Sequence, residues 1–98
     1  MTDNYHMEKR INAGYEIISS LAVCGTEFVL GKNDSAPECY VTWECNDGSN
    51  YFWGHYFSDF DSAYKDLHRR TEQKIRMYRK SIAIFSKNII WKIQGSIH

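Results

Sequence analysis

One apolar pattern with the period of an α-helix, running from Phe60 to Phe85, constrains the fold of this chain more than any other feature. Its members recur at spacings of 4, 3, 4, 4, 3, 4 and 3 residues: Phe60, Tyr64, Leu67, Thr71, Ile75, Tyr78, Ile82 and Phe85. Ser58 precedes the pattern as a good N-cap, and Asp61 follows three residues later in an approximate capping box. The spacing therefore predicts one long amphipathic helix over residues 58–85.

The charges along this segment also favour a helix. Acidic residues lie at its start, where the helix dipole is positive, and basic residues lie toward its end: Asp59, Asp61, Arg76, Arg79 and Lys80. Three acid-before-base pairs have i,i+4 spacing, each worth about 0.2–0.5 kcal/mol: Asp61–Lys65, Asp66–Arg70 and Glu72–Arg76. For the apolar tail, residues 86–98, three alternatives remain open: a fifth strand, a continuation of the helix, or an irregular segment.

Four strand-like runs precede the helix and are joined in pairs by turn signals. The runs are Tyr15–Val23, Glu27–Lys32, Cys39–Cys45 and Tyr51–Phe57. The first pair flanks Cys24-Gly25-Thr26, and the second flanks NDGSN, where Asp-Gly is a strong hairpin signal. We therefore expect an α+β fold: a four-stranded antiparallel sheet of two hairpins, followed by the helix packed on one face. One domain of 98 residues would comprise an N-terminal arm (1–13), the sheet (14–57), the helix (58–85) and the tail (86–98).

The charge balance excludes some classes of protein. Twelve basic and twelve acidic residues give a formal net charge of zero, unlike a DNA mimic or a histone-like coat protein. The charges are unevenly distributed, with eight acidic and three basic residues up to Phe57, and four acidic and nine basic ones after it. The chain has three cysteines, which form no CxxC pair, and it does not open with a secretory signal. We therefore expect reduced thiols and a cytoplasmic setting. No apolar run is long enough for a transmembrane helix, and we expect no membrane partner.

The residue types that carry chemistry are present but poorly grouped. A structural zinc at Cys39, Cys45 and His55 was considered, since a three-residue hairpin loop would place Val41 opposite His55. The short ligand pairs typical of zinc sites are missing, however, and a cysteine nucleophile would lack an identifiable base. We therefore expect neither an enzyme nor a cofactor.

Aromatic residues concentrate between residues 40 and 60 and suggest a binding surface. Strict alternation over Tyr51–Phe57 would place Tyr51, Trp53 and Phe57 on one face and Phe52 and Tyr56 on the other. Since one helix covers only one face, the tail, a second subunit or a target would have to cover the other. Gly54 within that strand indicates a bulge, a close backbone approach, or room for an aromatic ring.

Two stretches, GYEIISSLAVCGTEFVLG and VTWECNDGSNYFWGHYF, resemble small proteins carried by conjugative elements and phages of Gram-positive gut bacteria. The resemblance runs from about Gly14 to the middle of the helix. It implies a protein that neutralises host defence, either as an inhibitor of the type II CRISPR effector nuclease or as a companion of antirestriction proteins. It brings no catalytic residues.

The expected function is therefore an inhibitor that occludes a surface of that nuclease, whose basic channel would face the acidic sheet half. The expected partner-binding residues are Glu38, Tyr40, Glu44, Phe52, Trp53, Tyr56, Arg69, Arg76 and Lys80. One alternative is an accessory protein that binds nucleic acid through a basic stripe on the helix, Lys65, Arg69, Arg76 and Lys80, although such a stripe is also typical of a solvated helix face. The other alternative is a self-associating structural module.

Overall fold

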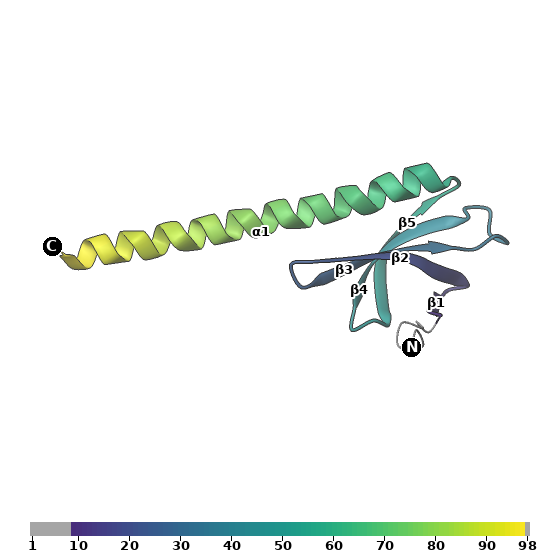
Figure 1. The fold of residues 1–98 in the computed structure, drawn as a ribbon, viewed down its shortest axis with the longest axis horizontal. Helices are drawn as coiled ribbons and strands as arrows, with labels where there is room; N and C mark the ends of the chain where they lie inside the picture. The colour runs from purple at the N-terminus through teal and green to yellow at the C-terminus, as the bar shows by residue number, and fades with distance from the viewer. Residues whose placement is uncertain (1–8, 98) are drawn as a thin grey trace, which may run out of the picture.

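The structure, a computed structural model, describes residues 9–97, including the side chains of residues 9–83. Its elements are β1 (Ile11–Asn12), β2 (Tyr15–Val23), β3 (Thr26–Lys32), β4 (Tyr40–Asn46), β5 (Asn50–Phe57) and α1 (Phe60–Ile97). The strands pair antiparallel in sequence order, and α1 follows them (Figure 1). The α+β class and the antiparallel sheet are thus confirmed, but the sheet has five strands instead of four.

The additional strand comes from the end of the expected N-terminal arm. Ala13 and Gly14 both have positive φ and turn the chain, so that Asn12 pairs with Tyr15. The backbone N–H of Ile17 also donates to the carbonyl oxygen of Arg10 at 2.8 Å. This short pairing carries no apolar alternation, which explains why the sequence did not predict it. Residues 1–8 lie outside the described part of the chain.

The two expected hairpins form at the expected turns. Cys24-Gly25 and Asp47-Gly48 have positive φ at both positions, the conformation of the type I′ turn, whose twist matches that of the strands. At the second turn Ser49 N–H donates to the carbonyl oxygen of Asn46 at 3.2 Å. In β4 the alternate residues Val41, Trp43 and Cys45 share one core cluster.

Helix α1 begins at Phe60, two residues later than expected, and ends at Ile97, twelve residues later than expected. Asp59, and not Ser58, is the N-cap: its carboxylate accepts hydrogen bonds from the backbone N–H of Ser62 at 2.8 Å and from the Ser62 hydroxyl at 2.9 Å. The helix then runs for 38 residues to Ile97, about 57 Å at 1.5 Å per residue. Of the alternatives for the tail, the structure shows the continued helix over residues 86–97.

One face of the sheet, the helix face, is covered by the first turns of α1. Ala63 and Leu67 pack there against Phe28 and Leu30, and all four are buried. The contact surface of α1 matches the predicted stripe only in part. Leu67 and Thr71 are buried as predicted, but Asp66 and Arg70 are buried as well, whereas Phe60 and Tyr64 are exposed. Polar partners on the sheet cause this rotation, as described below.

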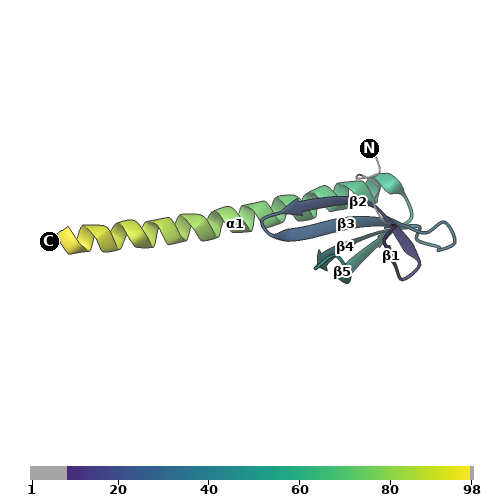
Figure 2. The same cartoon turned by 60° about the horizontal axis from the view of Figure 1, so that its bottom comes forward.

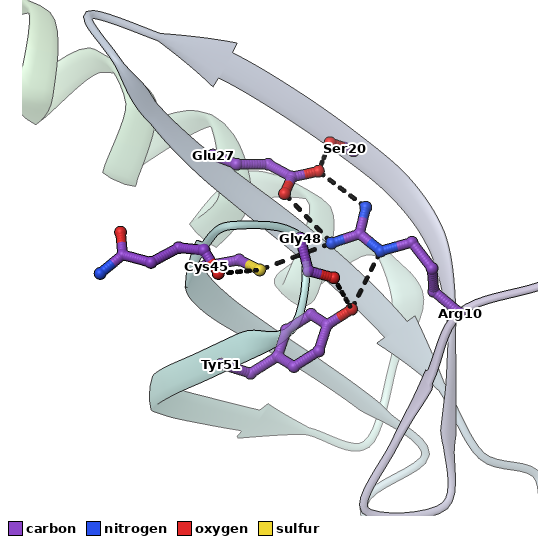
Figure 3. A network of polar contacts seen from close by, with 7 residues as sticks. Arg10, Ser20, Glu27, Cys45, Gly48 and Tyr51 are labelled. Atoms are coloured by element: carbon purple, nitrogen blue, oxygen red, sulfur yellow. Dashed lines mark hydrogen bonds and ion pairs between the residues drawn. The ribbon is translucent and has the colours of Figure 1, made fainter.

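The opposite face, here called the inner face, is covered by the sheet itself. Its core consists of Tyr15, Val29, Val41, Trp43 and Cys45. The sheet curls so far that Arg10, next to β1, reaches Tyr51 on β5: Arg10 Nε donates to Tyr51 Oη at 3.0 Å (Figure 3). Arg10 also donates to both carboxylate oxygens of Glu27, at 2.8 and 3.1 Å. The inner face therefore needs neither the tail, a second subunit nor a target to cover it.

The second half of α1 extends beyond the sheet (Figures 1 and 2). Exposed apolar side chains occur around the middle of α1, at Met77, Tyr78 and Ile82. Among the described residues, no helix combines the length and the apolar character needed to cross a membrane.

Candidate functional site

The backbone of β5 contains a bulge. Thr42 pairs with His55 and Glu44 pairs with Phe52, so that two residues, Trp53 and Gly54, lie opposite Trp43 alone. A Cβ atom at Gly54 would lie 2.7 Å from Nε1 of Trp43, so the Trp43 ring occupies the space that a side chain would need. Both expectations for Gly54, a bulge and room for an aromatic ring, are confirmed.

The bulge places Trp53 in a strained conformation on the surface. Its φ is 55°, in the left-handed region that a bulky side chain rarely adopts. Its side chain is 69% exposed and contacts the Phe52 ring edge-on, with 4.9 Å between ring centroids. The sheet thus projects this indole outward.

The bulge also reverses the predicted faces of β5. Tyr51 and Tyr56 both pack against Trp43 on the inner face, whereas Phe57 packs on the helix face. The sequence placed Tyr51 with Phe57 and Tyr56 with Phe52, and both assignments are wrong. One extra residue in a strand changes the parity of the alternation, so every side chain beyond it changes face.

Arg70 on α1 holds the bulge in place. Its guanidinium donates to the carbonyl oxygen of Trp53 at 2.8 Å, and to the carbonyl and hydroxyl oxygens of Thr42 at 3.1 and 3.0 Å. Burial lowers the pKa of Arg70, and the negative charges of Asp66 and Glu44 partly offset that effect. The predicted Asp66–Arg70 pair is therefore replaced: Arg70 binds the sheet, while Asp66 forms an ion pair with Arg69.

Asp66 is the second polar group that α1 inserts against the sheet. It is buried, accepts a hydrogen bond from Thr42 Oγ1 at 2.6 Å and lies 2.9 Å from His55 Nδ1. Burial alone would raise the pKa of Asp66, but the contacts with Thr42, His55 and Arg69 outweigh it and lower the pKa below its ordinary value. Asp66 is therefore charged at neutral pH.

A groove of about 500 Å³ opens between the bulge and α1. We call it the Trp53 groove; its lining residues are Phe28, Glu44, Trp53, His55, Arg70, Gln73, Lys74 and Met77. Phe28, Trp53 and Met77 supply apolar surface, while Glu44 and Lys74 supply opposite charges. These lining residues include no serine, threonine or cysteine. The arrangement suits the binding of a side chain or peptide segment by apolar and charged contacts.

The predicted partner-binding residues are only partly brought together. Glu44 and Trp53 line the Trp53 groove, and Phe52 pairs with Glu44 and touches Trp53. On α1, Arg76 and Lys80 line a second pocket together with Gln73 and Met77, which also line the Trp53 groove.

The remaining predicted residues lie elsewhere. Tyr56 packs on the inner face, and Arg69 is bound to Asp66. Tyr40 packs edge-on against Phe60 at the other end of β4, next to the loop that contains Glu38.

Sequence reasoning missed the lining residues His55, Arg70 and Met77, and it missed the buried Asp66 beneath them. One signal was available for two of these: Asp66 and Arg70 flank Leu67 and share its side of the helix, where polar residues need partners outside the helix. The considered zinc ligands do not converge. Because of the bulge Val41 pairs with Tyr56, so His55 lies on the helix face, while Cys45 lies in the inner-face core.

Comparison of the chain with known proteins found no matching protein-family model, no matching curated protein and no matching solved structure.

Proposed function

We propose that this protein is a non-enzymatic inhibitor that binds a bacterial defence nuclease, of the type II CRISPR effector kind, in the cytoplasm and blocks it by occupying part of its surface. Two arguments support this proposal. The class of partner comes from the sequence resemblance over Gly14 to the middle of α1. The binding surface comes from the Trp53 groove, and the observation that carries it is the strained, exposed indole of Trp53.

The conformation of Trp53 has a cost that glycine at this position would avoid. A left-handed φ costs an L-residue with a side chain about 1–2 kcal/mol, yet the chain has tryptophan at the position with φ 55°. Backbone strain of this kind clusters at functional sites, where the strained geometry presents a group that the site uses. Tryptophan is also the residue most enriched at the energetic centres of protein interfaces. Trp53 therefore has the conformation and chemistry of a binding anchor.

The groove beside Trp53 presents one carboxylate, that of Glu44, as well as the positive charge of Lys74, and a basic side chain would bind on the Glu44 side. A guanidinium can lie over the indole face and pair with the carboxylate of Glu44, which lines the same groove. Nucleases guided by RNA expose arginines and lysines where they hold nucleic acid and read the flanking motif. The groove residues would thus compete with nucleic acid for such a cation.

A cleavage assay with purified effector, guide and target DNA tests the proposal. We expect stoichiometric inhibition by the natural sequence and loss of inhibition in Trp53→Gly, which removes the indole and tolerates φ 55°. The matched control is Tyr64→Ala, which removes another exposed aromatic ring, from a residue that does not line the Trp53 groove. Inhibition unchanged by Trp53→Gly would remove the groove from the mechanism, and absence of inhibition and binding by the natural sequence would refute the proposed function.

Binding of nucleic acid by the basic stripe receives less support. Three of its four residues, Lys65, Arg69 and Arg76, form ion pairs with carboxylates of their own helix. A phosphate would have to displace those carboxylates. In the same assay, this alternative predicts that excess unrelated duplex relieves inhibition and that inhibition falls steeply with salt.

A further inference from the structure

The charges of the chain divide sharply along α1. Residues 73–98 contain six basic residues and no acidic one: Lys74, Arg76, Arg79, Lys80, Lys87 and Lys92. All twelve acidic residues therefore lie in residues 1–72, together with the other six basic ones, so the first part has a net charge of 6 − 12 = −6 and the second part +6. We call residues 73–97 of α1 the basic half-helix.

The basic half-helix is also rich in apolar residues. Met77, Tyr78 and Ile82 are 64, 52 and 47% exposed, although they are large and hydrophobic. In the sequence, apolar residues continue from Ile82 at the same spacing of three or four residues: Phe85, Ile89, Ile93 and Ile97. The helix itself continues to Ile97, so the apolar repeat from Tyr78 to Ile97 extends over about 29 Å.

We propose that the basic half-helix docks on an anionic lipid bilayer and lies in the plane of its interface. Helices that bind in this way combine an apolar side with lysines and arginines, so that apolar burial adds to the attraction of anionic headgroups. A cluster of four to eight basic residues on an amphipathic helix is the usual composition for anionic lipids. The negatively charged part, residues 1–72, would be repelled by the same surface, so the charge division also orients the molecule with the sheet away from the bilayer.

The other possible occupants fit these observations less well. Side-by-side pairing of two basic half-helices would bring +6 against +6, with no acidic residue available for pairs across the seam. A nucleic acid would satisfy the charge, but phosphate contacts leave exposed isoleucines and aromatic side chains such as Ile82 and Tyr78 in water. A bilayer accommodates both the charge and the apolar surface.

Co-sedimentation of the full-length protein with lipid vesicles tests the proposal. One set of vesicles contains phosphatidylcholine alone, and the other contains equal parts of phosphatidylcholine and phosphatidylglycerol. We expect binding to the anionic vesicles only, weakened when salt reaches about 1 M, where the Debye length falls to about 3 Å. The double variant Arg79→Gln, Lys80→Gln should lose roughly thirtyfold in partition, since each basic residue near the surface contributes about a factor of five. Lys65→Gln, which removes a charge outside the basic half-helix, is the matched control.

Four outcomes would overturn the proposal. Equal binding to both kinds of vesicle would remove the role of charge. Equal effects of Lys65→Gln and the double variant would remove the role of the basic half-helix. A concentration-dependent dimer in sedimentation without vesicle binding would assign the apolar repeat to a second copy. Binding of duplex DNA at the same salt, without vesicle binding, would assign it to nucleic acid.

Discussion

The guanidinium of Arg70 on α1 and the carbonyl oxygen of Trp53 on β5 are joined by a hydrogen bond of 2.8 Å, which connects the helix to the strained residue of the sheet. A β-bulge disrupts the regular ladder, so carbonyl groups near it need donors from elsewhere. Arg70 is such a donor for Trp53 and for Thr42. The docking of α1 and the shape of the Trp53 groove therefore depend on the same side chain.

Replacing Arg70 by methionine should destabilise the protein strongly. The substitution keeps the aliphatic part of the side chain but leaves two carbonyl oxygens and the Thr42 hydroxyl without their donor. We expect the free energy of unfolding to fall by about 2–4 kcal/mol, the range for breaking a buried charged network. Urea denaturation followed by circular dichroism measures this difference.

The control for Arg70 is its neighbour Arg69, which pairs with Asp66 from an exposed position. Arg69→Met should cost less than Arg70→Met, because Arg69 is the exposed partner of the pair and the buried Asp66 keeps its contacts with Thr42 and His55. Similar losses for the two variants would show that the contacts of Arg70 with the bulge contribute no more than a surface ion pair.

Asp66 should make stability depend on pH in a defined direction. Its pKa in the folded protein is lowered, so the charged form is favoured by folding. This contribution is fully present above the pKa of the unfolded chain, about 3.9, and is lost as the pH falls through the lower folded value. We expect the stability difference between the natural sequence and Asp66→Asn to be largest at neutral pH and to narrow below about pH 4.

Urea titrations of both proteins from neutral to acidic pH measure that difference. Asp61→Asn is the matched control, since Asp61 is an exposed carboxylate on the same helix, paired only with Lys65. If the stability difference between the natural sequence and Asp66→Asn stayed constant or widened toward acidic pH, the pKa of Asp66 would not be lowered by folding.

The two residues of the bulge should respond oppositely to substitution. Trp53→Gly relieves the positive φ, so stability should stay the same or rise by about 1 kcal/mol. Gly54→Ala places a methyl group 2.7 Å from Trp43 Nε1 and should cost about 1–3 kcal/mol. Denaturant unfolding measures both changes. Destabilisation by Trp53→Gly larger than that by Gly54→Ala would show that the indole serves packing and not display.

The sequence predicted the strands well because their signals are local. β2 was expected at Tyr15–Val23 and lies there. Both hairpin turns also lie at the expected places, where a glycine, Gly25 or Gly48, takes the second of two positive-φ positions. The bulge at Trp53 was only one of three possibilities indicated by Gly54, and the faces assigned without it were wrong. A bulge is defined by the pairing of two strands, and here Trp53 and Gly54 lie opposite Trp43. The alternation of residues within one strand does not predict that pairing.

The candidate site was predicted in part for the same reason. Glu44 and Trp53 could be selected because aromatic residues concentrate between residues 40 and 60 and because the sheet half is acidic. The roles of Asp66 and Arg70 could not, since their partners Thr42 and His55 come from other elements. The apolar period of α1 predicted that Phe60 and Tyr64 face the sheet. The contacts of Asp66 and Arg70 with the sheet instead rotate the helix so that Phe60 and Tyr64 are exposed.

The closure of the inner face by Arg10 gives a last prediction. Arg10 binds both carboxylate oxygens of Glu27, and each of the two side chains is less than a third exposed. The hydrogen bonds from Arg10 are the main cause of the lowered pKa of Glu27. A double-mutant cycle of Arg10→Gln and Glu27→Gln should therefore give a coupling free energy of about 0.5–1.5 kcal/mol at neutral pH, more than an exposed pair gives. The cycle for Lys32 and Asp34, an exposed pair at 3.5 Å, should give a value near zero. Equal coupling free energies in the two cycles would mean that the Arg10–Glu27 pair stabilises the curled sheet no more than an exposed ion pair does.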